Sequence, residues 1–530
     1  MSELVPIEQL GSVGLITDVP PYQLPPAGWS GGSNIRFDDT AVKKSPGYKE
    51  VMATCPFPPK YLETYQEYDS RGYYWIAFGD TDVAVWSGGI WTDVTPATGL
   101  SGDTFRQWQT TKLGAILIAT NGVDKPIYWP LGDDELARAT NKFKTLEDWP
   151  EEYLNCQTIE GFKSFVVAGS IMRDDGIRIN RTVIWSDMTN QYTPPNSWDP
   201  LDPDGDAGEY ELLETEGPVV HIQNLHESCM IYKTDSVYNM SFVGAPFMFS
   251  FKVMNPDVGI MCKNACTDFP GGHWFVGNDD CYVNNGQQIQ PMLTQKVRRE
   301  MFENIDGDAF LRTFCVTNLG NTEIWTCYPT VGSQFCDRAI VWNYVNNTFS
   351  FRDLPDLSHI KYGVSVVSEG ITWDEQTLNW DETTEKWGTG SYDNVVEHLV
   401  FAEPDKTKIY RDESSNTENG DMMYSWVERT GIDLGDPSSV KHVRAVWPKM
   451  HTSGTGTVKV STGFQMSSDQ PVTWDSVVQY DPDTMSKISV RTTGKLFAIK
   501  VETEADLDWN LSSVEYEIAP AGRRGSRNYA

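Results

Sequence analysis

The chain has 530 residues, 39% of them hydrophobic, and its aromatic residues number 19 Trp, 23 Tyr and 22 Phe. This length exceeds what one hydrophobic core serves and the composition excludes a disordered chain, so we expect several globular units. The net charge of −32 excludes binding to a nucleic-acid backbone by counterion release. No run of about 18 apolar residues and no secretory leader occurs. We therefore expect that the chain is made in the cytoplasm and does not insert into a membrane.

Residues 1–55 predict an extended N-terminal arm. They contain PPYQLPPAGWSGGSNIRFDDTAVKKSPGY, in which closely spaced prolines favour extended backbone, and the string NIRF begins a short strand. Such a segment has little core of its own. We therefore expect it to lie on another domain or on a neighbouring subunit, as part of a platform.

Residues 56–415 carry a strand–turn–strand pattern that recurs about seven times. Each copy is an apolar strand, a polar turn and a second strand that closes on an aromatic residue; these residues are Trp86, Tyr128, Trp185, Tyr238, Tyr282, Trp342 and Tyr410. The closing residues lie roughly 40 to 70 positions apart, about the length of one four-stranded propeller blade with loop insertions. The pattern predicts a multi-bladed β-propeller and leaves the number of blades open. One helix is expected, from Thr294 to Asn304 with Thr294 as N-cap.

Two long acidic insertions interrupt the repeat, at residues 190–217 and 368–394. Loops of this length in a compact fold usually have a contact role. The candidate contact residues, at a channel wall or at a tip, are Asp202, Asp204, Asp206, Glu209, Asp374, Glu375, Asp381 and Glu382. The string DPDGD within the first insertion lacks the glycine spacing and flanking helices of an EF-hand, so we interpret it as a solvated turn.

The C-terminal part predicts a second β domain. Residues 412–421, DESSNTENGD, have no apolar side chain and indicate a linker. Residues 421–520 then contain five alternating stretches, VKHVRAVWPKM, GTVKVSTGF, KISVRTT, KLFAIKVE and SVEYEIAP, which favour a β-sandwich. The last segment, 521–530, is basic, and its candidate subunit contacts are Arg523, Arg524 and Arg527.

The sequence shows no catalytic motif. None of the seven histidines belongs to a GxSxG or HExxH string, and no Walker-type loop occurs. Cys262, Cys266, Cys281 and His273 are close in sequence, but their spacing matches no standard zinc site, and we interpret the nine cysteines as reduced, buried thiols. We therefore expect no enzyme activity, no cofactor and no metal.

Several strings together resemble the tail nozzle proteins of short-tailed bacteriophages, also described as tail tubular protein B-like or packaged-DNA stabilisation proteins. They are PPYQLPPAGWSGGSNIRF, RTVIWSDMTNQYTPPNSWDP, YKTDSVYNMSFVGAPFMFSF and the closing strings KHVRAVWPKM, TTGKLFAIKVE and VEYEIAPAGRRG. The resemblance is one of segment order over nearly the whole chain. It implies a structural virion protein of the tail, six copies of which form a ring below the portal adaptor.

In such a ring, the arm and the sandwich would form the platform, and the implied partners are the adaptor protein, tail fibres or spikes, and double-stranded DNA that passes without specific binding. The acidity would then keep DNA mobile, although it also fits simple solubility. Two other hypotheses stay open. One is a carbohydrate-binding or glycan-cleaving propeller for host attachment, and the other is a cellular propeller scaffold for protein partners.

Overall fold

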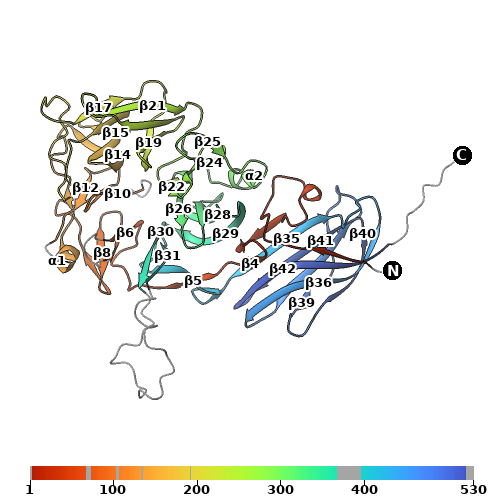
Figure 1. Cartoon of the computed structure of the whole chain (residues 1–530). Coiled ribbons are helices and arrows are strands. Elements are labelled where there is room, and N and C mark those ends of the chain that lie inside the picture. Colours follow the sequence, from red (N-terminus) through yellow and green to blue (C-terminus); the bar gives the residue numbers. More distant parts are fainter. Residues whose placement is uncertain are drawn as a thin grey trace, which may run out of the picture.

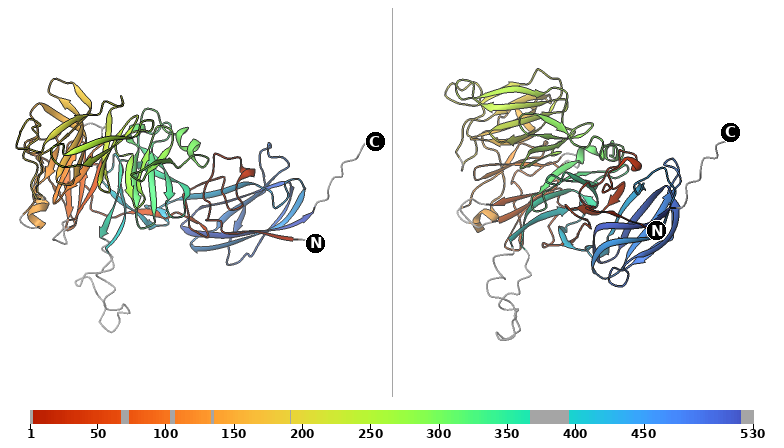
Figure 2. Two further views of the ribbon diagram at one scale, coloured as in Figure 1. Left: turned by 45° about the horizontal axis from the view of Figure 1, so that its top comes forward. Right: turned by 45° about the vertical axis from the view of Figure 1, so that its right-hand side comes forward.

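The computed structural model of the chain describes residues 3–66, 73–102, 107–132, 135–190, 192–366 and 395–520. These residues form a β-propeller and a β-sandwich that lie side by side (Figure 1). The sandwich keeps to one side of the propeller in the other views as well (Figure 2). The predicted fold class is therefore confirmed: the chain is all-β, with a multi-bladed propeller, a C-terminal sandwich and an N-terminal arm.

The first six blades are antiparallel sheets of four strands that follow one another along the chain. The first three are β6 (Tyr61–Gln66), β7 (Tyr73–Phe78), β8 (Val83–Ser87) and β9 (Ile90–Asp93); β10 (Gln109–Leu113), β11 (Ile116–Thr120), β12 (Ile127–Trp129) and β13 (Lys144–Thr145); and β14 (Tyr153–Phe162), β15 (Phe165–Arg173), β16 (Arg178–Trp185) and β17 (Gly208–Glu211). The next three are β18 (Val219–Leu225), β19 (Ser228–Lys233), β20 (Val237–Phe242) and β21 (Phe249–Asn255); β22 (Cys266–Phe269), β23 (Gly272–Val276), β24 (Cys281–Asn284) and β25 (Ile289–Pro291); and β26 (Phe314–Asn318), β27 (Glu323–Tyr328), β28 (Cys336–Asn343) and β29 (Thr348–Leu357).

The seventh blade closes the ring with a strand from the other end of the chain. Its sheet runs β30 (His359–Val366), β31 (Val395–Ala402), β32 (Ile409–Ser415) and then β5 (Gly47–Glu50). The ring of Tyr48 on β5 packs edge-on against Phe401 at 4.9 Å and Tyr410 at 5.4 Å. The arm therefore ends before residue 47 and not at 55. The sequence did not predict β5 because a single, partly buried aromatic side chain in a short polar string gives no strand signal.

Each predicted hairpin supplies the second and third strand of one blade. The second strands β11, β23 and β27 are buried along their whole length. A strand covered by a neighbouring blade on both faces reads as a continuous apolar run, not as an alternating pattern. The closing aromatics lie on the third strands, and six of the seven are buried, while Trp86 is partly exposed. The recurring hairpins thus correspond one to one with the blades.

The segment 412–421 is not a linker. β32 continues to Ser415, and β33 (Thr417–Glu418) and β34 (Asp421–Met422) extend the same sheet beyond β5. The carboxylate of Asp412 is buried and paired with the guanidinium of Arg352 at 2.8 Å. Polar composition misled the prediction because ion pairs, and not apolar side chains, fill this part of the interior.

The sandwich consists of two sheets built from both parts of the chain. One sheet contains β1 (Glu3–Ile7), β3 (Ile35–Phe37), β4 (Val42–Lys44), β36 (Lys441–Gly454), β40 (Ile488–Gly494) and β42 (Leu507–Pro520). The other contains β2 (Gly31–Ser33), β35 (Tyr424–Ile432), β37 (Val458–Gln465), β38 (Thr473–Trp474), β39 (Val478–Tyr480) and β41 (Leu496–Glu504). All five predicted C-terminal strands exist, and the arm completes both sheets.

The arm also joins the sandwich to the sixth blade. The amide of Leu15 donates to the carbonyl of Phe349 at 3.0 Å, and the amide of Asn34 to that of Phe351 at 2.9 Å. Leu15 and Trp29 are buried in a hydrophobic cluster that continues from blades four to six into the sandwich. The arm thus has no core of its own and packs into the junction of the two domains.

The helix predicted from Thr294 to Asn304 is shorter. α2 spans only Arg298–Phe302, and Val297 stands at its N-cap. Gln295 has a φ of 62°, in the left-handed region, which interrupts a right-handed helix. Thr294 donates its hydroxyl to Asp280 at 2.6 Å instead of capping the helix. The other helical elements are α1 (Glu135–Thr140), η1 (Pro21–Gln23) and η2 (Phe310–Arg312).

Gly47→Ala should destabilise the closing strand. A Cβ at Gly47 would lie 2.1 Å from the carbonyl oxygen of Thr417, so the backbone of β5 or β33 must shift. Overpacking of this kind costs about 1–3 kcal/mol. Thermal unfolding checks it, with Gly307→Ala as control because nothing lies within 4 Å of a Cβ there. Equal unfolding temperatures for the two variants would contradict the prediction.

Candidate functional site

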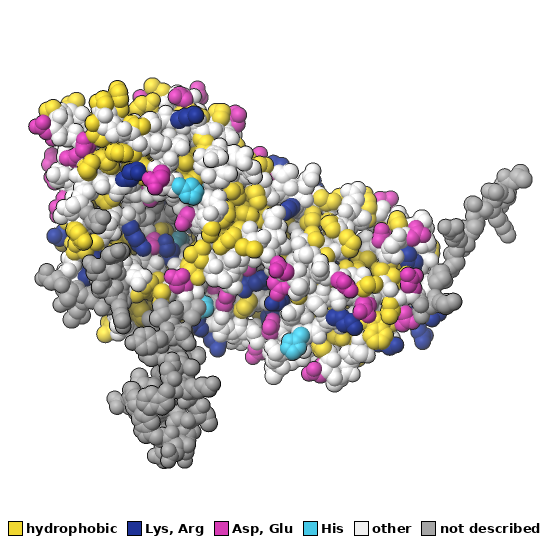
Figure 3. Space-filling view, viewed as in Figure 1, with side chains coloured by type: hydrophobic (Ala, Val, Ile, Leu, Met, Phe, Trp, Pro, Cys, Tyr) yellow, Lys and Arg dark blue, Asp and Glu magenta, His cyan; other side chains and the backbone are white. Residues whose placement is uncertain are grey.

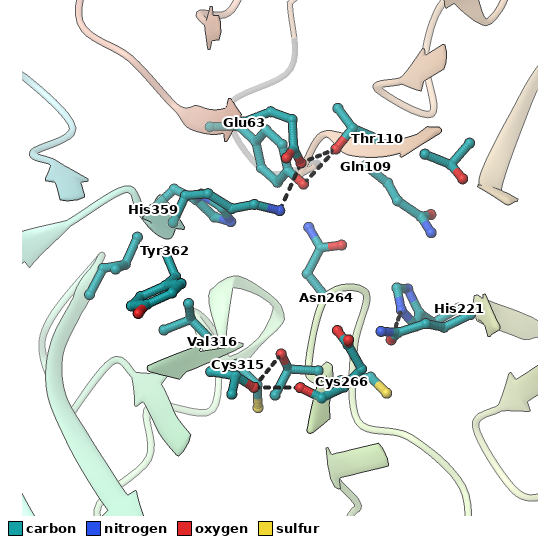
Figure 4. Close-up of a pocket in the computed structure, with 18 of the residues that line it drawn as sticks. Glu63, Gln109, Thr110, His221, Asn264, Cys266, Cys315, Val316, His359 and Tyr362 are labelled. Carbon is teal, nitrogen blue, oxygen red and sulfur yellow. Dashed lines mark hydrogen bonds and ion pairs between the residues drawn. The ribbon is translucent and has the colours of Figure 1, made fainter. Parts of the chain in front are cut away.

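The first strands of the seven blades enclose a cavity of about 700 Å³ at the hub of the propeller (Figure 4). Every blade contributes at least one polar side chain to its wall, among them Glu63, Thr111, Glu160, His221, Thr267, Thr317 and Lys361. The space-filling view shows a hollow in this face of the propeller with charged and histidine side chains around it (Figure 3). The cavity has the size of a small-molecule site.

The wall is polar because each first strand is the inner edge of its sheet. The free amides of an edge strand need hydrogen-bond acceptors, and here the preceding blade provides them. The amide of Gly161 donates to the hydroxyl of Thr111 at 2.8 Å, and the amide of Ile222 to the hydroxyl of Thr158 at 3.0 Å. Polar side chains thus bind neighbouring blades to one another.

One partly buried ion pair lies across the closure of the ring. Lys361 Nζ on β30 is 2.9 Å from Glu63 Oε2 on β6, and the hydroxyl of Thr110 donates to the same carboxylate at 2.5 Å. Burial alone would raise the pKa of Glu63, but the charges of Lys361 and Lys112 and the hydrogen bond from Thr110 outweigh it and lower the pKa to about 2. Glu63 is therefore a carboxylate held in place by its partners.

The two histidines of the wall are neutral near pH 7. Burial lowers the pKa of both His221 and His359 to about 3. His359 Nδ1 accepts the amide of Leu62 at 3.3 Å, and its ring packs on Tyr61 with centroids 4.1 Å apart. These contacts explain His359 as a structural residue between the last and the first blade.

Glu160 behaves in the opposite way to Glu63. Burial raises the pKa of Glu160 to about 8, and the nearby Asp268 adds to the rise against a hydrogen bond with Thr111. Glu160 Oε1 accepts the side-chain amide of Asn224 at 2.8 Å. Of these two hub carboxyl groups, Glu63 is thus ionised and Glu160 is protonated at neutral pH.

Two amide side chains reach across the hub. Asn264 Nδ2 donates to the carbonyl of Trp108 at 2.7 Å, which joins the segment before β22 to the segment before β10. Gln109 Nε2 on β10 donates to the carbonyl of Ile222 on β18 at 3.2 Å, also between blades that are not neighbours. Asn264 lies in the middle of the close-up (Figure 4). The hub is therefore a crossed cavity and not a passage wide enough for a DNA duplex.

Glu160→Gln should remove one pH dependence of stability. A group whose pKa rises from 4.5 to about 8 on folding contributes stability that is complete below pH 4.5 and is lost as the pH rises through 8. The free energy of unfolding of the variant, relative to that of wild type, should therefore rise by on the order of 2–4 kcal/mol from pH 5 to pH 9. Urea unfolding at the two pH values measures it, with exposed Glu151→Gln as control. An unchanged difference between the two pH values would refute it.

Four of the sequence-predicted contact residues lie away from the hub. Asp202, Asp204, Asp206 and Glu209 belong to the insertion between β16 and β18, at the outer edge of the third blade, and none of them lines the hub cavity. Asp202 Oδ1 accepts the amide of Asp204 at 3.0 Å, as in a tight turn. Their assignment to a channel wall or tip stays a prediction.

The remaining predicted residues are outside the described part of the chain. They are Asp374, Glu375, Asp381 and Glu382 of the second insertion, and Arg523, Arg524 and Arg527 of the basic segment. The charged groups of the hub were missed altogether. A signal existed in the polar strings before each hairpin, such as QTTKL at 109–113, but without a fold they read as ordinary exposed strands.

The cysteine and histidine group forms no metal site in the described residues. Among them, no three His, Cys, Asp or Glu side chains are arranged to hold a metal ion. His273 instead bonds through Nδ1 to the hydroxyl of Tyr232 and through Nε2 to the carbonyl of Asn224, both at 2.8 Å. The thiol of Cys262 donates to the carbonyl of Thr313 at 3.2 Å. All nine cysteines are free thiols, and eight are buried.

Comparisons with known proteins add little to this description. No protein-family model matches the chain, and no curated protein does. Among solved structures, a crystal structure of BBS1N in complex with ARL6DN is similar at 9% identity, with a TM-score of 0.35, over 70% of this chain and 96% of that one. Apart from these comparisons, the described residues contain no helix that is long and apolar enough to cross a bilayer.

Proposed function

We propose that the chain is a structural subunit of a short bacteriophage tail, a nozzle protein that forms a hexameric ring below the portal adaptor. The observation that carries the proposal is that both ends of the chain fold into one sandwich beside the propeller. This arrangement matches the platform and propeller that the resemblance implies. The subunit would retain packaged DNA, conduct it during ejection and reside in the virion tail.

The closed hub supports a passive role for the propeller in this ring. Because Asn264 and Gln109 cross the cavity, DNA would pass between copies of the chain and not through a hub. Six copies at −32 each would carry 192 negative charges, which favours a hydrated, mobile duplex over a bound one. The implied partners are the adaptor protein above and tail fibres or spikes at the side.

Electron microscopy of the purified chain mixed with adaptor rings tests the proposal. The expected result is a six-fold ring seated on the adaptor. Failure to join an adaptor ring, together with binding to cellular proteins in pull-downs, would overturn it in favour of a cellular scaffold.

A second candidate is a glycan-binding or glycan-cleaving propeller. It is favoured by the hub cavity, which holds Glu63 and Glu160 with pKa values near 2 and near 8. Carboxyl groups of opposite ionisation are the usual equipment of glycoside hydrolysis. Glycan-array binding or release of reducing sugar, lost in Glu160→Gln, would support it. Without either signal, the two groups serve only the fold.

A further inference from the structure

A groove of about 580 Å³ lies between the outer edges of the third and fourth blades. One wall is the acidic insertion with β17, and the other is the turn from β20 into β21. β17 and β21 are edge strands of their sheets, and Figure 1 shows them together at the top of the propeller. The groove is separate from the hub, whose lining shares no residue with it.

The floor of the groove is aromatic. Tyr210 stacks flat on Phe251 with ring centroids 4.4 Å apart, and Trp185 packs edge-on against Phe249 at 5.3 Å. Phe247 is 77% exposed and Tyr210 43% exposed, so large ring faces meet solvent here. Figure 3 shows hydrophobic side chains gathered over this part of the propeller. Exposed aromatic surface of this kind marks an interaction site.

The rim of the groove is acidic and lacks a compensating cation. Asp202, Asp206 and Glu209 line it, and no lining residue is Lys, Arg or His. Within the described residues, no ion pair joins these carboxylates to a basic side chain, whereas the neighbouring Glu211 is paired with Arg181 at 3.2 Å. The groove therefore offers aromatic faces together with carboxylates that have no ion-pair partner among the described residues.

We propose that this groove binds the basic segment 521–530 of a second copy of the chain. The segment has the sequence AGRRGSRNYA, with three arginines and no acidic side chain. A guanidinium group pairs with carboxylates and also stacks on aromatic rings, so arginine matches both features of the groove. The proposal rests on the ring assembly proposed above and names the contact between its subunits.

The segment cannot reach the groove of its own chain. It follows β42, which ends at Pro520 in the sandwich, whereas the groove lies at the far edge of the propeller (Figure 1). Ten extended residues span at most about 33–36 Å, and a propeller of this size measures roughly 50 Å across. The contact therefore joins different copies. Because it pairs two different surfaces, it is heterologous and closes into a ring or propagates as a filament.

Sedimentation velocity of two variants and of their mixture tests the proposal. R523Q/R524Q/R527Q removes the donor charges, and D202N/D206N/E209Q removes the acceptor charges. We expect each variant alone to be monomeric at concentrations where wild type assembles. Their mixture should form heterodimers and nothing larger, because only one intact donor and one intact acceptor remain per pair.

A fluorescent peptide of residues 521–530 provides a second measurement that does not depend on assembly. We expect it to bind the R523Q/R524Q/R527Q chain about tenfold more tightly than the D202N/D206N/E209Q chain, with affinity falling as salt rises. E151Q/E152Q/E216Q removes three exposed carboxylates outside the groove and should not change binding.

The outcomes separate this inference from the proposed function. Equal peptide binding by the groove variant and the control, or a glycan that occupies the groove and is not displaced by the peptide, overturns the inference. The nozzle proposal survives either result if the chain still joins adaptor rings. Peptide binding without any ring on the adaptor supports the groove assignment and counts against the nozzle.

Discussion

Lys361→Met should be among the most destabilising single substitutions in the propeller, at about 3–5 kcal/mol. The substitution leaves the buried carboxylate of Glu63 without its ion-pair partner, which costs far more than removing both charges. Glu63 is only 4% exposed, whereas the side chain of Lys361, its ion-pair partner in the hub, is 33% exposed, so the cost comes from the buried carboxylate. The pair joins β6 to β30, so its loss also weakens the closure of the ring. Urea unfolding of wild type and variant measures the change.

The double variant Glu63→Leu/Lys361→Met is the matched control. It removes both charges and should recover most of the stability that Lys361→Met loses, because replacing a buried pair by apolar side chains is often nearly neutral. If the double variant were as unstable as the single one, packing and not the unpaired carboxylate would explain the loss.

The ion pair of Glu63 and Lys361 also makes the stability of the propeller depend on pH in the acidic range. Since the pKa of Glu63 is lowered to about 2, its contribution is complete above pH 4.5 and is lost as the pH falls from 4.5 to 2. In Lys361→Met, the missing ammonium group should raise this pKa. The acid-induced loss of stability between pH 4.5 and pH 2 should then be smaller in the variant than in wild type, because the folded and unfolded pKa values of Glu63 lie closer together.

The propeller could be predicted because the two central strands of each blade have an unambiguous pattern. Strands such as β7 (YYWIAF) and β27 (EIWTCY) are covered on both faces, so burial forces a continuous apolar string between turns. The first strands carry a mixed pattern because one side faces the polar hub, as in QTTKL of β10. The number of blades stayed open because β5 comes from far earlier in the chain and carries only one aromatic ring, which is partly buried.

The groove, too, could be predicted from the sequence only in part. The acidic insertion could be singled out by its length and composition, and its outward position follows from where it leaves β16 and returns as β17. Its aromatic partners could not, because Trp185 and Phe249 belong to different blades and meet only when neighbouring sheets pack. A local sequence pattern does not contain that contact.

The ion pairs at the domain junction were misread for a related reason. Asp412 and Glu413 occur in a string without apolar residues, which is the ordinary signature of a solvated linker. Asp412 pairs with Arg352, 60 positions away, and Glu413 pairs with Arg36, 377 positions away. Only the fold brings these charges together and makes their burial tolerable.

Arg36→Met should destabilise the junction between sandwich and propeller by about 3–5 kcal/mol. Arg36 on β3 pairs with Glu323 of the sixth blade at 2.6 Å and with Glu413 of the seventh blade at 2.5 Å. The side chain of Glu323 is 2% exposed and that of Glu413 is 18% exposed, so the substitution leaves two carboxylates facing each other in a poorly solvated site. In calorimetry, the unfolding transitions of the sandwich and the propeller should be further apart in temperature in the variant than in wild type.

The control for this prediction neutralises the carboxylates as well. Arg36→Met combined with Glu323→Gln and Glu413→Gln should regain stability over Arg36→Met alone, because the repulsion between the two acids is gone. A second control, Lys43→Met, removes the exposed partner of Asp38 on the neighbouring strand β4 and should change stability by less than about 1 kcal/mol. If Arg36→Met and Lys43→Met had equal effects, the buried network would not be what couples the domains, and the hydrophobic cluster around Leu15 and Trp29 would have to account for the coupling.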